Sequence, residues 1–224
     1  MDMVRARLEA LEEYGVMDTT AESAFDELTE LAAELFQAPI SLVSLLDDKR
    51  QWFKSRVGVV DAETSIEHAF CAHAIHGADV MVVPDARNDE RFADNPYVSG
   101  VDAFRFYAGA PLITPRGIAL GTLCVIDREP RQALGVREKQ ILKRLAAFVM
   151  IELEYRRLAR EAERQLEKAI DLIELELTAQ RAMPAADPVS QMHAVRAVAD
   201  RVDRLKDRCY RVANLLELSR QSAG

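Results

Sequence analysis

The chain has 224 residues, enough for one large domain or for one medium-sized domain with an appendage, which argues against a multi-domain enzyme. Apolar residues make up 49% of the chain and charged residues 29%, a balance that excludes intrinsic disorder. The formal net charge of -8 argues against nucleic acid as a partner, because phosphate binding needs a local excess of Lys and Arg.

Two helices are expected before the first strand. The first covers residues 4–14 and ends at Gly15. The run TTAE at 19–22 has the pattern of a capping box, in which the first Thr bonds forward to the backbone and the Glu bonds back. It would open a second helix that ends at Pro39. Apolar residues at spacings of three and four predict its buried face: Phe25, Leu28, Ala32 and Leu35.

Strand patterns dominate the middle of the chain. Residues 40–46 are mostly apolar, as in a strand covered on both faces, and extended structure resumes at 51–53. The run TSIE at 64–67 is a second capping-box pattern, which predicts a short helix after it. Residues 80–83 predict a short central strand, and residues 104–126 predict a long hairpin. We therefore expect an antiparallel sheet with helices around it.

The C-terminal third is expected to form a helical hairpin. A helical pattern without Pro or Gly runs over the 48 residues 136–183, much longer than a helix inside a globular domain. Beyond Pro184 and Pro188, apolar residues alternate at spacings of three and four, which predicts a coiled-coil seam. The seam positions are Val195, Val198, Val202, Leu205, Cys209, Val212 and Leu216. Two long helices with a narrow seam predict a homodimer that forms a four-helix bundle.

Five motifs follow one another in the middle of the chain. They are FCAHAI at 70–75, VPDA at 83–86, RFADNP at 91–96, FYAGAPL at 106–112 and LGTLCVID at 120–127. On these motifs the chain resembles the GAF domain family, in the bacterial sensory form found ahead of histidine kinases and diguanylate cyclases. The resemblance implies an α+β fold with a six-stranded antiparallel sheet flanked by helices, used to sense a small molecule or another signal.

The expected organisation combines this domain with the helical pattern. An N-terminal helix covers residues 1–18, the GAF sensor 19–150, a signalling helix 151–183, a turn 184–188 and the second helix of the hairpin 189–224. The chain shows no kinase nucleotide-binding motif, no cyclase-like GGDEF and no HExxxP box, and its nine glycines leave little for a phosphate-binding loop. We therefore assign no catalytic residue and favour a role other than that of an enzyme.

Candidate ligand-binding residues lie on the two hairpins and the short helix. Strand alternation places Trp52 opposite Phe53 and Phe106 opposite Tyr107, so that one member of each pair can line a cavity. Aromatic walls suit a small planar ligand such as a purine, whereas core packing is the competing interpretation. The full set is Trp52, Phe53, Phe70, Cys71, His73, Phe106, Tyr107 and Cys124.

The cysteines allow further interpretations. Cys71 and His73 lie two residues apart on a helix, so their side chains point about 200° apart and no metal site is expected. Ala72, where photosensory GAF domains carry a His beside the attachment Cys, counts against a bilin chromophore. Cys71 and Cys124 could form a redox pair, since GAF-fold free methionine sulfoxide reductases use cysteines in this pocket. Packing of two buried thiols is the alternative.

The tail offers candidates for partner binding. His193 lies off the seam and could accept a phosphoryl group, although a solvated surface residue is the competing interpretation, because no acidic or Asn neighbour supports a nucleophile. Residues 189–224 carry a local charge of +3 and residues 1–188 carry -11, which makes the tail the surface expected to meet an acidic protein. A response regulator or a kinase would be such a partner.

The expected function is that of a dimeric signal-transduction protein. Its GAF domain would sense a small molecule or a redox signal and relay it through the helical hairpin to a partner. The alternatives are a redox enzyme resembling free methionine sulfoxide reductase, and a phosphotransfer-like hairpin that acts with a separate kinase or response regulator. The chain has three widely spaced cysteines, which predicts reduced thiols. Its acidic N-terminus and the lack of an apolar run of membrane length predict a cytoplasmic protein with no membrane contact.

Overall fold

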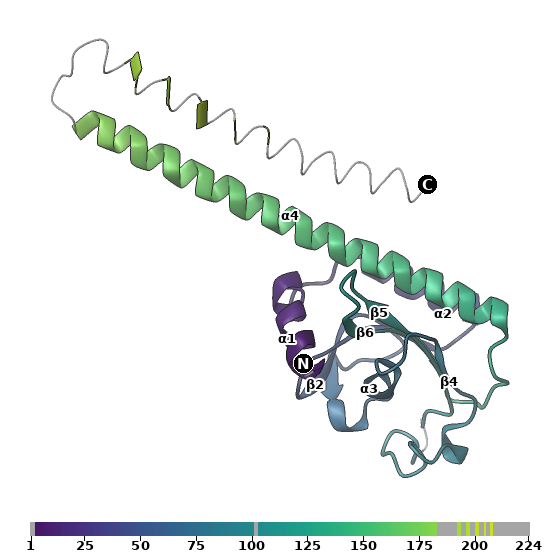
Figure 1. Cartoon of the computed structure of the whole chain (residues 1–224). Coiled ribbons are helices and arrows are strands. Elements are labelled where there is room, and N and C mark those ends of the chain that lie inside the picture. The colour runs from purple at the N-terminus through teal and green to yellow at the C-terminus, as the bar shows by residue number, and fades with distance from the viewer. Residues whose placement is uncertain are drawn as a thin grey trace. The chain divides into compact units, whose positions relative to one another are not determined.

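The computed structural model describes residues 3–100 and 103–182, together with eight single positions between 192 and 207. The chain divides into two compact units, Met1–Glu154 and Tyr155–Gly224. The first unit contains a sheet with helices on both faces, and the long helix α4 (Val136–Ala182) begins in it and ends in the second unit (Figure 1).

The sheet has six antiparallel strands in the order β3-β2-β1-β6-β5-β4. Their bounds are β1 Ile40–Leu46, β2 Arg50–Val57, β3 Glu63–Ser65, β4 Met81–Val83, β5 Phe106–Ile113 and β6 Ala119–Asp127. Strand β1 lies inside the sheet and is buried over all seven residues, because helices cover both of its faces. The predicted α+β fold is confirmed.

Successive residues of β1 serve two separate cores. Val43 and Leu45 belong to the core on one face, and Leu42 and Leu46 belong to the core on the other. This follows from the two-residue period of a strand, which sends neighbouring side chains to opposite faces. We call the two sides of the sheet the α4 face and the α3 face, after the helices that cover them.

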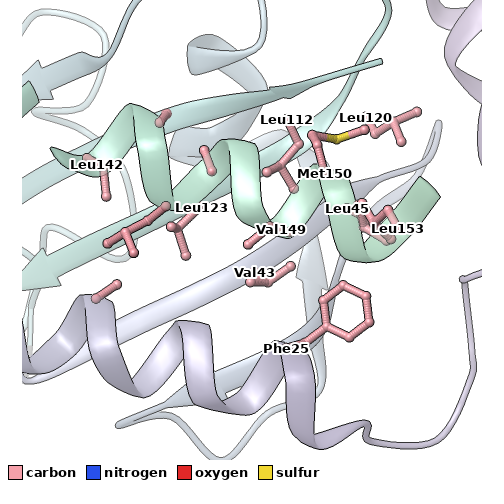
Figure 2. Packing of buried hydrophobic residues seen from close by; sticks show 14 of the residues in the cluster. Phe25, Val43, Leu45, Leu112, Leu120, Leu123, Leu142, Val149, Met150 and Leu153 are labelled. Atoms are coloured by element: carbon pink, nitrogen blue, oxygen red, sulfur yellow. The ribbon is translucent and has the colours of Figure 1, made fainter. Parts of the chain in front are cut away.

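The α4 face carries a continuous apolar core. It is covered by α1 (Met3–Tyr14), α2 (Ser23–Phe36) and the first part of α4. Figure 2 shows side chains from α2 and α4 meeting strand residues across this layer. The labelled contributors are Phe25, Val43, Leu45, Leu112, Leu120, Leu123, Leu142, Val149, Met150 and Leu153. Arg7 fixes α1 to the sheet by donating from Nε to the carbonyl oxygen of Leu46 at 2.9 Å.

The α3 face is covered by short elements. A single 3-10 turn, η1 (Ile66–His68), leads into α3 (Phe70–Ala74), and a second 3-10 turn, η2 (Ala86–Asn88), follows β4. The aromatic rings of Phe70 and Phe92 stack at 4.0 Å between centroids within this core. The α3 face is therefore held by loops and one-turn helices, unlike the α4 face.

Both predicted capping boxes are wrong. Helix α2 begins at Ser23, and Glu22 makes no side-chain cap bond, because Lys54 donates to Glu22 Oε1 at 2.5 Å and ties it to β2. Thr19 instead donates to the carbonyl oxygen of Val16. In the second run, Ser65 caps η1 by accepting from the backbone N–H of Glu67 at 3.3 Å, while its neighbour Thr64 lies in β3.

Two further expectations are corrected. Leu35 of α2 is 55% exposed, because the helix buries a face formed by Phe25, Thr29, Ala32, Ala33 and Phe36. Strand β4 is an edge strand and not a central one, since it pairs with β5 at the end of the sheet order. Pro84 follows β4 at once and limits it to three residues.

The long helix is present as expected, with Ala182 as its last residue. The seven seam positions (Val195, Val198, Val202, Leu205, Cys209, Val212 and Leu216) and the turn at 184–188 lie outside the described residues. Within the second unit, Arg201 forms an ion pair with Glu176 of α4. None of the helices that the structure describes combines the length and the apolar run that a bilayer crossing requires.

Candidate functional site

A cavity of about 80 Å³ lies between the α3 face of the sheet and the short helices that cover it. Five aromatic side chains line it, and they come from β2, α3, the loop after η2 and β5: Phe53, Phe70, Tyr97, Phe104 and Tyr107. Polar groups are added by Gln51, Asp61, Thr64 and His68, of which Asp61 is exposed and connects the cavity to the surface.

Strand alternation divides the predicted ligand-binding aromatics. Phe53 and Tyr107 line the cavity, whereas Trp52 and Phe106 belong to the core of the α4 face and do not reach it. The sequence predicted that the members of each pair would separate, and the structure identifies which member faces the cavity.

The short-helix candidates also separate. Phe70 and Cys71 of α3 line the cavity. His73 is exposed, and its ring meets the edge of Phe92 at 4.9 Å between centroids. Partial burial and the positive charge of Arg91 hold the pKa of His73 below its ordinary value. His73 therefore lies beside the cavity and not in its wall.

Two cavity-lining polar residues were missed by the sequence analysis. Gln51 and Thr64 lie directly opposite each other in the ladder between β2 and β3. Within the described part of the chain, Gln51 Oε1 and Thr64 Oγ1 are buried and have no hydrogen-bond partner. A buried polar atom without a partner costs about 1–3 kcal/mol, so such atoms are rare unless a ligand or water satisfies them. No sequence pattern predicted β3, and without its register this pair could not be found.

At the cavity wall, two thiols meet in a buried polar cluster, with Cys71 in the wall and Cys124 behind it. Cys71 Sγ and Cys124 Sγ lie 3.8 Å apart, and the Tyr107 hydroxyl donates to Cys71 Sγ at 3.4 Å. The hydroxyls of Ser44 and Thr122 lie next to each other at 3.2 Å on β1 and β6. The α3 face thus gathers five buried groups that can donate a proton around one point, where the α4 face buries isolated hydroxyls such as those of Thr29 and Ser41 in an apolar core.

Glycine at position 109 makes room for this cluster. A Cβ added there would lie 2.1 Å from the Tyr107 hydroxyl oxygen, a distance that no real contact allows. The YAG run of β5 therefore combines a tyrosine with the space its ring needs, because residues two apart on a strand share a face. This gives a physical role to one of the five motifs.

The remaining predicted candidates lie elsewhere. His193 occupies a described helical position and is exposed. Among the described residues, no three His, Cys, Asp or Glu side chains come together as potential metal ligands.

Comparison with known proteins agrees with this architecture. The family model described as GAF domain matches residues 20–153. A cyclic di-GMP phosphodiesterase of Pseudomonas aeruginosa is 46% identical over 140 residues, which cover 62% of this chain and 24% of that protein. The chain therefore spans about a quarter of the length of this relative.

Solved structures share the fold. The GAF domain of an Acinetobacter phosphoenolpyruvate-protein phosphotransferase matches with a TM-score of 0.50 and 16% identity, over 68% of this chain and 91% of that one. Free methionine-R-sulfoxide reductase of Neisseria meningitidis, in complex with its substrate, matches with a TM-score of 0.50 and 19% identity, over 71% and 95%. Identities this low show a common fold and carry no statement about activity. With its six-stranded sheet and the family match over residues 20–153, the chain belongs to the GAF domain family.

Proposed function

We propose that this chain is a sensory module in which the cavity on the α3 face binds a small planar molecule and α4 passes the effect to a partner. The observation that carries the proposal is the pair of buried, unpartnered oxygens, Gln51 Oε1 and Thr64 Oγ1, in a cavity lined mainly by aromatic and aliphatic side chains. Aromatic walls with a few fixed polar groups are the usual composition of a small-molecule site.

The polar atoms favour a particular ligand chemistry. Gln51 Oε1 accepts a hydrogen bond, and the Thr64 hydroxyl can either donate or accept one. A planar ring that carries N–H groups on one edge would satisfy both oxygens while it stacks on rings such as Phe53 and Phe70. A nitrogen heterocycle of the purine type has these properties.

The size of the cavity suggests how binding produces a signal. Its volume of about 80 Å³ is roughly half of the ~150 Å³ of a cavity that holds a benzene ring. A bicyclic ligand would therefore have to widen the cavity by displacing its wall. The wall opposite the sheet is formed by one-turn helices, which lack the inter-strand hydrogen bonds of the sheet, so the displacement would fall on α3 and η1.

Helix α4 offers a route for the signal and a surface for dimerisation. It packs on the α4 face through Leu142 and Leu153, then continues to Ala182. Its later part exposes four large apolar side chains, which favour association with a second copy of the chain. These residues are Leu166, Ile170, Leu172 and Leu175. The proposed homodimer would bury them and present the tail to a signalling partner such as a kinase or a response regulator.

The relationship to the phosphodiesterase supports a regulatory role. That relative is named for an activity on cyclic di-GMP, and the region it shares with this chain makes up 24% of its length. A shared sensory region that accompanies different outputs would explain an identity of 46% over a stretch of 140 residues.

The ligand proposal is tested by calorimetric titration of the full chain with adenine and guanine, alongside native mass spectrometry of the purified protein. We expect binding of one base, or a copurified heterocycle, that is weakened at least about tenfold in the Gln51→Leu/Thr64→Val variant, because two hydrogen bonds are lost. The matched control is Gln140→Leu/Thr178→Val, which makes the same changes at exposed positions of α4. Binding that is equal in both variants, or absent from the wild-type chain, contradicts the proposal.

The dimer proposal has a separate test. Deleting residues 189–224 should shift the chain from dimer to monomer in analytical ultracentrifugation, because the expected seam is removed. A dimer that persists unchanged would show that the seam is not the interface.

A further inference from the structure

The two buried thiols are arranged as a reactive pair. Cys71 belongs to α3 and Cys124 to β6, 53 residues apart, and their sulfur atoms lie 3.8 Å from each other. A disulfide bond is about 2.05 Å long, so the sulfurs need to approach by about 1.8 Å. Cys71 is carried by a helix of five residues, which can make this small movement more easily than the sheet can.

The surrounding groups give the two thiols different acidities. Burial alone would raise the pKa of Cys71, but hydrogen bonds from Cys124, Ser44, Thr122 and Tyr107 outweigh it and lower this pKa to about 6. The pKa of Cys124 is raised well above its ordinary value, first by its hydrogen bond to Cys71 and then by burial. Cys71 is therefore the more acidic thiol of the pair and ionises first, while Cys124 keeps its proton.

Access to the pair is also asymmetric. Cys71 lines the cavity, and the cavity reaches the surface beside Asp61. Cys124 is fully buried in the sheet behind Cys71. A small oxidant that enters the cavity therefore reaches the sulfur of Cys71 first. The sulfur of Cys124 lies 3.8 Å from that of Cys71 and can react with it in a second step.

We infer that Cys71 and Cys124 form a dithiol site that reduces small hydroperoxides and is itself oxidised to a disulfide. The Cys71 thiolate attacks the distal oxygen of the peroxide, the O–O bond breaks, and the leaving oxygen takes back from solvent the proton that Cys71 released on ionising, which gives water or an alcohol. Cys71 is then a sulfenic acid. The Cys124 sulfur attacks the Cys71 sulfur, the S–O bond breaks, and water leaves with the proton of Cys124. In total, two thiols and one hydroperoxide give one disulfide, one water and one further water or alcohol.

Tyr107 is a positioning residue for this step. Its hydroxyl donates to Cys71 Sγ, and burial together with the neighbouring thiol charge raises the pKa of Tyr107 well above its ordinary value, so it stays protonated. Its hydroxyl is therefore a lasting donor to the thiolate. The chemistry does not depend on the planar ligand proposed above.

Oxidation of the purified full chain with hydrogen peroxide tests the inference. After increasing exposure, free thiols are alkylated and the peptides are mapped by mass spectrometry. We expect one dominant disulfide within the chain, between Cys71 and Cys124. Absence of this linkage at peroxide concentrations that oxidise Cys209 overturns the inference, and this readout needs no variant.

Variants assign the roles of the two sulfurs. In Cys124→Ala, a sulfenic acid on Cys71 should be trapped by dimedone; in Cys71→Ala, Cys124 should stay unmodified. Equal trapping on Cys124 in the second variant would overturn the assignment. Tyr107→Phe should slow oxidation by roughly two- to fivefold near pH 6, because losing one donor raises the thiolate pKa by about half to one unit. The effect should fade at high pH, which a merely structural role would not produce.

The outcome is separate from that of the ligand titration. Peroxide oxidation is measured with no heterocycle present, so its failure leaves the ligand proposal unchanged. A chain that oxidises as expected but binds no base supports the dithiol site alone.

Discussion

The two faces of the sheet are built from the same strands and serve different purposes. On the α4 face, long helices and strand residues bury a continuous apolar layer. On the α3 face, the strands meet one-turn helices around a cavity, two unpartnered oxygens and a pair of thiols. Ser41 Oγ on the α4 face also lacks a partner among the described residues, so what separates the faces is the continuous apolar core of one and the cavity and buried polar cluster of the other.

The strongest test of this comparison uses two neighbours on β1. Leu45 is fully buried on the α4 face, and Leu45→Ala should lower the free energy of unfolding by about 2–5 kcal/mol, because it leaves a cavity. Ser44 points to the α3 face, and Ser44→Ala should cost only about 0.5–1.5 kcal/mol. Urea denaturation measures both, and equal losses would break the comparison.

A clash inside the α3 face should have the next largest effect. Gly109→Ala places a Cβ 2.1 Å from the Tyr107 hydroxyl oxygen, so it should destabilise the chain by about 1–3 kcal/mol. The cost should fall in the Tyr107→Leu background, where the hydroxyl and ring are gone. A double-mutant cycle in urea checks this, and an unchanged cost would show that the tyrosine is not the obstacle.

Removing the unpartnered oxygens should stabilise the unliganded chain. In Gln51→Leu/Thr64→Val, two buried polar atoms without partners are replaced by apolar groups, and the free energy of unfolding should rise by about 1–2 kcal/mol. Thermal and urea unfolding of the unliganded protein measure the change. A marked loss of stability would mean that these oxygens have partners in solution, and the functional interpretation of the α3 face would lose its basis.

The smallest expected effect comes from an ion cluster at the edge of β2, outside both cores. Arg50 bonds to Asp18, Asp47 and Glu63. The hydrogen bond with Arg50 holds the pKa of Asp18 below its ordinary 3.8. Burial opposes a similar lowering at Asp47, but hydrogen bonds from Lys49 and Arg50 prevail.

Because these carboxyl groups have a depressed pKa in the folded state, their contribution is complete above the unfolded pKa of 3.8 and is lost as the pH falls through the lower folded values. Arg50→Gln should remove about 0.5–1 kcal/mol at neutral pH, after the partial exposure of the pairs is allowed for. The difference from the wild-type chain should shrink below about pH 4, as urea unfolding across pH would show. A difference that is constant with pH would exclude the ion pairs as its cause.

Features that depend on the spacing of neighbouring residues along one strand could be predicted from the sequence. Alternation separated Trp52 from Phe53 and Phe106 from Tyr107, but the side of the sheet that carries the cavity depends on which helices cover it, and no local pattern contains that information. Gln51 and Thr64 were missed because β3 has only three residues, so its pairing with β2 becomes visible only in the fold.

Other errors came from patterns that tertiary contacts override. Glu22 looked like the return member of a capping box, but Lys54 of β2 takes its carboxylate. Leu35 fits a helical period, yet the buried stripe of α2 is shifted to Ala33 and Phe36. The five motifs identified the family correctly because some of their residues, such as Gly109, are required by a close contact between side chains in the fold. Secondary-structure propensity alone would not require them.

The two-residue alternation of the inner strands has a consequence for evolution and engineering. On β1, cavity-side and core-side residues alternate, so the detecting surface can diverge without any change to the layer that α4 stabilises. A combinatorial library restricted to Leu42, Gln51, Phe53 and Ile126 would vary the cavity wall while every residue of the α4 core keeps its identity. The sheet therefore separates the cavity-lining residues, which can be substituted, from the residues of the α4 core, which the stability of the fold requires.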